Sequence, residues 1–206
     1  MNSLPFSMKY IFYFILLILL SSCTATTPKN TNNICQIFKE KDDWYTHAKA
    51  SSKKWGLPIH INMAIMHQES RFVADAQPPR PRILGFIPWF RSSSAYGYAQ
   101  AQDGTWDDYL KSAGAWSADR DDYADACDFI GWYCVISHRK LGISKWNTEK
   151  LYLAYHEGHG GYKRKTYLKK RWLLNTAKKV AKKSQQFNAQ LSGCKDELES
   201  TSWFFW

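Results

Sequence analysis

The chain has 206 residues, of which 45% are hydrophobic, 22% charged and 16% aromatic, and its formal net charge is +10. So many aromatic side chains exclude an intrinsically disordered chain and favour a compact fold, with some aromatics able to face sugars or a membrane. The excess of positive charge favours anionic partners.

The first predicted element is an export signal. Lys9 precedes an apolar run at 10–20, which is too short for a comfortable membrane span and has the length of a signal-peptide core. Residues 20–23, LSSC, resemble the bacterial lipobox, in which the cysteine is lipidated after cleavage. We therefore expect residues 1–22 to be a lipoprotein signal peptide and Cys23 to carry the lipid. The alternative is a plain secretory signal with an incidental cysteine.

A lipid on Cys23 would anchor the protein to a membrane. Several acyl chains give stable membrane binding, whereas a single chain gives only marginal binding. Thr24 is not the Asp of inner-membrane retention, so we expect a periplasmic protein on the inner leaflet of the outer membrane. There the anionic partners would be peptide-stem carboxylates of the cell wall or lipid phosphates, and not nucleic acid.

Four cysteines remain after Cys23: Cys35, Cys127, Cys134 and Cys194. An even number in an oxidising compartment suggests two disulfides, with three possible pairings. On one continuous helix, residues 127 and 134 would lie about 10 Å apart, beyond bridging distance. That spacing favours bonds from Cys35 and Cys194 to this central helix. A four-cysteine metal site is disfavoured because no C-x-x-C pair exists.

The apolar periodicity predicts a mainly α fold without convincing strands. Residues 23–34 read as a polar tether, 35–195 as one domain, and 196–206, ending in SWFFW, as an aromatic C-terminal tail. Helical patterns occur around 37–48, 58–70, from 105, at 129–141, at 151–155 and from about 163 to 191. Residues 76–93, rich in Pro, Arg and aromatics, read as a long loop, and such loops are usually functional or disordered.

Glu69 lies near the end of the apolar helix that begins after Pro58. Ile61, Ile65 and Glu69 share one helical face, whereas Asn62 and Ser70 are expected to face water. A carboxyl at the edge of an apolar wall should have a raised pKa, which suits a general acid. The alternative is a structural carboxylate paired with Arg71 or another cation.

Three segments carry a family resemblance in the right order: ESRF (69–72), SAYGYAQ (94–100) and AYHEGHGG (154–161). Together they resemble the lytic transglycosylase (SLT domain) family of the lysozyme-like superfamily. Its pattern is E-S-x-F, then a G-L-M-Q-like segment with Thr five residues later, then A-Y-N-A-G-x-G. The matching positions are Glu69, Ser70, Phe72, Gly97, Gln100, Thr105, Ala154, Tyr155, Gly158 and Gly160.

The resemblance spans residues 45–165 and implies a single lysozyme-like domain with a groove for peptidoglycan glycan strands. It implies that Glu69 protonates the bond between N-acetylmuramic acid and N-acetylglucosamine, and then acts as base while the muramyl O6 closes a 1,6-anhydro ring. No metal or organic cofactor is required. The residues that it implies for substrate binding are Gln100, Tyr155, Tyr98, Ser94 and His156.

The chain also departs from the family pattern. Tyr98-Ala99 replaces Leu-Met, and His156 and Glu157 stand where Asn and a small residue are usual. Any of residues 92–94 could match the family's serine, and the loop at 77–93 lengthens the segment between the first two motifs.

Three other functions are compatible with these residues. A zinc site at His156, Glu157 and His159 is disfavoured because the spacing is not HExxH. A hydrolytic muramidase would need a second acid, for which Asp75, Asp103 and Glu157 are candidates. A non-catalytic lipoprotein that binds peptidoglycan in an envelope or secretion assembly is the alternative outside enzymes, with FIPWF (86–90) and SWFFW as docking surfaces.

Overall fold

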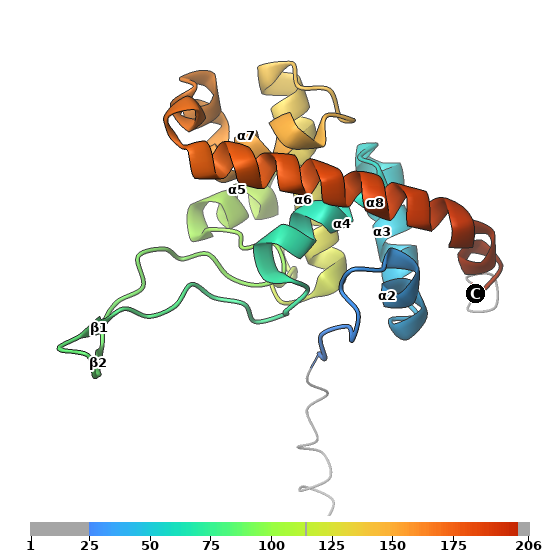
Figure 1. Ribbon diagram of the computed structural model, residues 1–206, viewed down its shortest axis with the longest axis horizontal. Coiled ribbons are helices and arrows are strands. Elements are labelled where there is room, and N and C mark those ends of the chain that lie inside the picture. Colours follow the sequence, from blue (N-terminus) through green and yellow to red (C-terminus); the bar gives the residue numbers. More distant parts are fainter. Residues whose placement is uncertain (1–24, 114, 202–206) are drawn as a thin grey trace, which may run out of the picture.

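The computed structural model describes residues 25–113 and 115–201, apart from the side chains of residues 87, 88 and 201 (Figure 1). This part of the chain is mainly helical, as predicted. Its elements are α2 (Ile34–Glu40), α3 (Trp44–Trp55), α4 (Ile59–Ser70), β1 (Arg82–Ile83), β2 (Ile87–Pro88), α5 (Asp103–Ala113), α6 (Tyr123–Leu141), α7 (Thr148–Lys163), the 3-10 helix η1 (Thr166–Lys169) and α8 (Arg171–Thr201).

Helix α4 is central, and every residue from Ile61 to His67 is buried. Asn62 and Ser70, expected to face water, are buried as well, which corrects that prediction. The Asn62 Nδ2 donates a 2.8 Å hydrogen bond to the carbonyl of Cys127, which lies on α6. The Asn62 Nδ2 is therefore satisfied by neighbouring backbone, whereas its Oδ1 is buried without a hydrogen-bond partner among the described residues.

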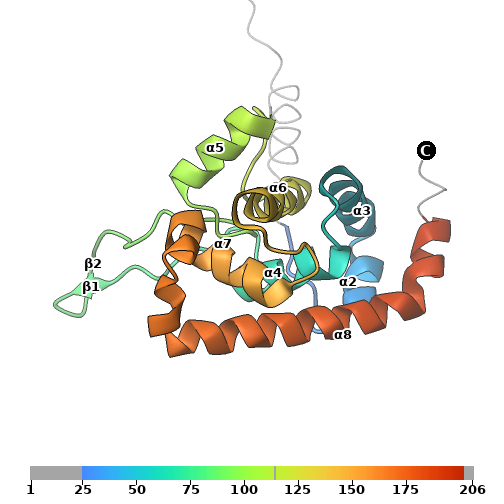
Figure 2. The same cartoon turned by 90° about the horizontal axis from the view of Figure 1, so that it is seen from above.

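Helix α8 runs along one side of the domain, against α2, α4 and α7 (Figure 2). Its predicted apolar stripe is buried, at Leu173, Ala177, Val180, Phe187 and Leu191. The same period continues through Cys194 to Leu198, since side chains three and four positions apart share a helical face.

The predicted domain boundary at residue 195 consequently falls inside α8, which ends at Thr201. The part of SWFFW at 202–206 lies outside the described residues, as do the predicted signal peptide and Cys23. At the other end of the predicted domain, the tether region also contacts the fold. Pro28 is buried, and the Lys41 Nζ donates to the Thr26 Oγ1 at 2.7 Å. No helix among the described residues has the length and apolarity to cross a membrane.

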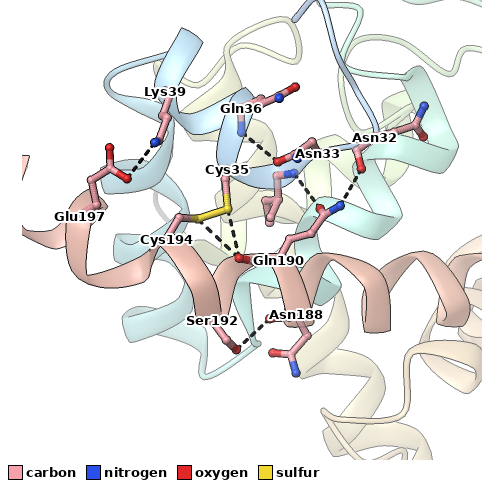
Figure 3. Close-up of a disulfide and its surroundings, with 11 residues drawn as sticks. Asn32, Asn33, Cys35, Gln36, Lys39, Asn188, Gln190, Ser192, Cys194 and Glu197 are labelled. Atoms are coloured by element: carbon pink, nitrogen blue, oxygen red, sulfur yellow. Dashed lines mark hydrogen bonds and ion pairs between the residues drawn. A yellow bond between two sulfur atoms is a disulfide. The ribbon is translucent and has the colours of Figure 1, made fainter.

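The predicted disulfide pairing is wrong. Cys35 on α2 is bonded to Cys194 on α8, with Cα atoms 6.1 Å apart, and Cys127 and Cys134 are free and buried (Figure 3). Both free cysteines lie on the single helix α6, the condition under which the sequence placed them out of bonding distance of each other. The bridge forms because the buried stripe of α8 continues to Cys194 and packs this part of the helix against α2, a placement that helical periodicity alone does not reveal.

Residues around this bridge also join α2 to α8 (Figure 3). The Ile34 backbone N–H donates to the Gln190 Oε1 at 3.0 Å, and Lys39 pairs with Glu197 at 2.8 Å. The ion pair is exposed and contributes little, whereas the covalent link restricts the unfolded chain.

Residues 77–93 form the predicted long connection, with a short antiparallel hairpin, β1–β2, at its tip. The hairpin projects away from the helices (Figure 1), and its side chains Leu84, Phe86 and Phe90 are exposed.

Replacing both bridged cysteines, as Cys35→Ser with Cys194→Ser, should lower the free energy of unfolding by roughly 2–5 kcal/mol, since the bond closes a loop between residues 159 apart. Urea unfolding monitored by circular dichroism would measure the loss. As a control, a reducing agent should destabilise the wild type and leave the double variant unchanged. Equal stability of the two oxidised proteins would contradict the prediction.

Candidate functional site

Glu69 lies in the last turn of α4 with one carboxyl oxygen enclosed. Its Oε1 is buried and has no hydrogen-bond partner among the described residues. No ion pair of the described part of the chain includes Glu69, and the nearby Arg71 donates instead to the His67 Nε2 at 3.1 Å. The structural alternative, in which Arg71 pairs with this carboxylate, is therefore not what the fold contains.

The ESRF motif forms a tight reversal at the end of α4. Arg71 and Phe72 both adopt the left-handed backbone conformation, with φ of 56° and 64°, which is uncommon outside glycine. The Ser70 hydroxyl stabilises this turn by accepting from the Phe72 N–H at 3.1 Å and donating to the Met66 carbonyl at 3.3 Å. Phe72 then enters the core. The turn fixes the end of the helix one residue after Glu69.

Burial raises the pKa of Glu69 from 4.5 to about 7, and the Tyr152 hydroxyl opposes this as a hydrogen-bond donor. Buried carboxylic acids ionise less readily because the charged form loses its hydration. A carboxyl with a pKa near 7 can both give and take a proton at neutral pH. Sequence reasoning missed Tyr152, although its position three residues before Tyr155 places both tyrosines on one face of α7.

The SAYGYAQ motif forms a turn that bonds to the residues preceding it in the chain. Gly97 has φ of 78°, and a Cβ there would collide with the backbone carbonyl of Arg120, so only glycine fits. The Gln100 Nε2 donates to the carbonyls of Ala76 and Gly97 at 2.7 and 3.0 Å. The amide nitrogen of Gln100 therefore holds the turn together, which leaves its side-chain oxygen as the atom that could contact a sugar.

The third motif joins this turn to α7. The Tyr155 hydroxyl donates to the Ala99 carbonyl at 2.7 Å, and the Glu69 carboxylate adds to burial in raising the pKa of Tyr155. Gly158, with φ of 71° and ψ of 159°, breaks the helical backbone, so α7 consists of two helical segments that meet at a kink. Tyr155 thus links the SAYGYAQ turn, through Ala99, to the Glu69 carboxyl of the first motif.

Tyr98 belongs to the core and not to a substrate surface. Its side chain is 2% exposed and packs edge-on against Trp44 and Tyr123. Its predicted role in substrate binding is therefore corrected, because an enclosed ring has no surface to offer. Ser94 is exposed, and its Oγ accepts from the Asp103 N–H at 3.1 Å, at the start of α5.

His156 and Glu157 point toward the end of α7 and the segment after it. The Glu157 side chain is 3% exposed and pairs with the Lys170 Nζ at 2.6 Å and with the Thr166 hydroxyl. Burial opposes ionisation of Glu157, but these two donors outweigh it and lower the pKa. The His156 ring packs edge-on against Trp172, with centroids 5.1 Å apart.

His159 turns the other way, stacked on Tyr133 and bonded to the Ser137 hydroxyl at 2.9 Å. This orientation takes His159 away from His156 and Glu157, which meet each other at 3.4 Å, so the three groups that could have bound zinc do not converge. The described residues contain no cluster of three or more His, Cys, Asp or Glu suited to a metal ion.

The domain is mainly helical and encloses the Glu69 Oε1 at the end of α4, which is consistent with a lysozyme-like domain. Residues 11–194 match the transglycosylase SLT domain family, so the chain belongs to this family. No curated protein and no solved structure matches the chain. Membership implies a function of the lytic transglycosylase type, with peptidoglycan as the substrate.

Glu69→Gln should make the protein more stable at alkaline pH. The pKa of Glu69 is higher in the folded state, so the unfolded chain loses this proton first, and stability falls as pH rises from 4.5 through about 7. The glutamine side chain stays neutral and avoids this loss. The free energy of unfolding of the variant should therefore exceed that of the wild type by up to about 3 kcal/mol at pH 8. Urea unfolding of both proteins at pH 5 and pH 8 would measure it. A constant difference between them at the two pH values would argue against a buried, proton-binding Glu69.

Proposed function

We propose that this protein is a peptidoglycan lytic transglycosylase in which Glu69 is the catalytic acid and base. The observation that carries the proposal is the enclosed Glu69 Oε1, which has no hydrogen-bond partner among the described residues, on a carboxyl with a pKa of about 7. Leaving such an atom unpaired is costly to folding, and a catalytic role is one explanation for an unpaired buried group in a native protein.

In the proposed reaction, protonated Glu69 donates its proton to the glycosidic oxygen between N-acetylmuramic acid and N-acetylglucosamine. As the C1–O bond breaks, the muramyl O6 bonds to C1, and the Glu69 carboxylate takes the O6 proton. Water is not consumed, and the carboxyl returns to its starting state. One carboxyl suffices because the substrate's own hydroxyl replaces the second acid of ordinary glycosidases.

The positions of the other acids favour this reaction over hydrolysis. Glu157 is paired with Lys170, and Asp103 accepts from the Arg120 Nη1 at 2.8 Å. Among the groups that shift the pKa of Glu69, there is no Asp or Glu of the described residues. A muramidase would need such a carboxylate on the opposite side of the sugar to activate water.

Digestion of isolated sacculi should release 1,6-anhydromuropeptides, detected by mass spectrometry. Glu69→Gln should reduce release by at least about a hundredfold, as expected for loss of a general acid, while the circular dichroism spectrum stays unchanged. The wild-type rate should fall as pH rises above about 7, because Glu69 must begin protonated. Products with free reducing ends would identify a muramidase, and sacculus binding without any products would identify a non-catalytic role.

We also propose that the protein is a lipoprotein of the outer-membrane inner leaflet, facing the periplasm. Support comes from the lipobox-like LSSC at 20–23 and from the Cys35–Cys194 disulfide, which suits an oxidising compartment. Expression in a Gram-negative host should give protein in the outer-membrane fraction whose first residue is a lipidated Cys23. Cys23→Ser should move it to the soluble periplasmic fraction. An intact residue 1–22 segment on the purified protein would contradict the proposal.

A further inference from the structure

An open hollow of about 670 Å³ lies between the hairpin loop and the helical body. Its walls come from both legs of the loop, from the segment that leads into the SAYGYAQ turn, from the start of α5 and from the loop before α6. Glu69 does not line it. The hollow adjoins the site through the turn, because Ala76, which accepts from Gln100, directly precedes the lining residue Gln77. Its volume is in the range of sites for small ligands.

The charged side chains of the hollow are three arginines and one aspartate. The charge of Arg120 is paired, since its Nη1 donates to Asp103 as well as to the carbonyls of Ser94 and Ala101. The Arg91 Nε donates to the Pro78 carbonyl at 2.9 Å and so joins the two legs of the loop. Arg80 forms no hydrogen bond or ion pair with the described residues, and it is exposed. The hollow therefore presents an uncompensated guanidinium to a ligand.

Aromatic rings flank these charges. Trp89 and Phe90 are 51% and 80% exposed, and their rings meet edge-on with centroids 5.4 Å apart. Tyr96 lies opposite, under the Arg120 guanidinium at 5.4 Å. These large exposed rings do not contribute to the buried core, and they offer flat apolar faces beside a cation. Such a combination fits a ligand with both carboxylates and apolar surface.

We propose that this hollow binds the peptide stem of peptidoglycan, with Arg80 pairing to a stem carboxylate and Trp89 and Phe90 covering its aliphatic part. The inference rests on the proposed function, because it takes peptidoglycan as the substrate of Glu69. Guanidinium groups pair with carboxylates through two parallel hydrogen bonds, and the chain is strongly basic overall. A stem in the hollow would leave its glycan strand beside the SAYGYAQ turn, next to the site.

The test measures binding by calorimetry in the Glu69→Gln background, so that no ligand is consumed. The two probes are a soluble muropeptide, which is a disaccharide with a tetrapeptide stem, and the same disaccharide without its peptide. Arg80→Gln should weaken binding of the muropeptide about tenfold and leave binding of the bare disaccharide unchanged. Arg82→Gln is the matched control, because Arg82 is exposed on the same hairpin and does not line the hollow.

Three results would overturn the inference: no measurable muropeptide binding, equal affinity with and without Arg80, or an equal loss for both probes. The digestion of sacculi by the wild type distinguishes this failure from failure of the proposed function. If the wild type releases anhydro products but binding does not depend on the peptide stem, only the proposal that the hollow binds the stem is overturned. Stem-dependent binding without any products would instead refute the catalytic role of Glu69.

Discussion

The enclosure of one carboxyl at the end of a buried helix is the constraint around which this domain is organised. Taking the Glu69 charge out of water without a cation is unfavourable, so the rest of the structure must offset that cost. Helix α4 meets the requirement by burying residues 61–67, which precede Glu69, and α8 packs against α4. The pKa of about 7 is the direct result of this burial.

Many motif residues of the site contact or hydrogen-bond to backbone groups. Ser70 bonds the turn after α4, Gly97 admits the Arg120 carbonyl, and Gln100 joins Gly97 to Ala76. Tyr155 then connects this turn to α7 through the Ala99 carbonyl. The three short motifs are therefore best understood as the pieces that hold one position, that of Glu69, between elements far apart in the chain.

Periodicity was enough to predict what depends on local apolar patterning. The central α4, the buried stripe of α8 and the place of Glu69 on an apolar face all follow from spacings of three and four residues. Periodicity did not predict the features that depend on tertiary contacts. The burial of Asn62 depends on the Cys127 carbonyl, and the pairing of Cys194 depends on the packing of α8 against α2.

Two further residues show the same limit. Tyr98 matched a motif position, yet its ring fills the core beside Trp44, because the fold uses the bulk of this residue and not its polarity. Tyr152 carried no motif signal, although its hydroxyl acts on the Glu69 carboxyl. Family patterns identify positions, and only packing decides whether a side chain at such a position faces the substrate.

The Cys35–Cys194 bond also has a mechanical meaning. It joins the first helix of the described domain to the last, near the points where the chain enters and leaves the fold (Figure 3). Tension applied to the chain before Cys35 and after Cys194 would pass through this covalent link and bypass the helices between them. The region around Glu69 would carry no load, so a protein pulled at both ends would keep its site undistorted.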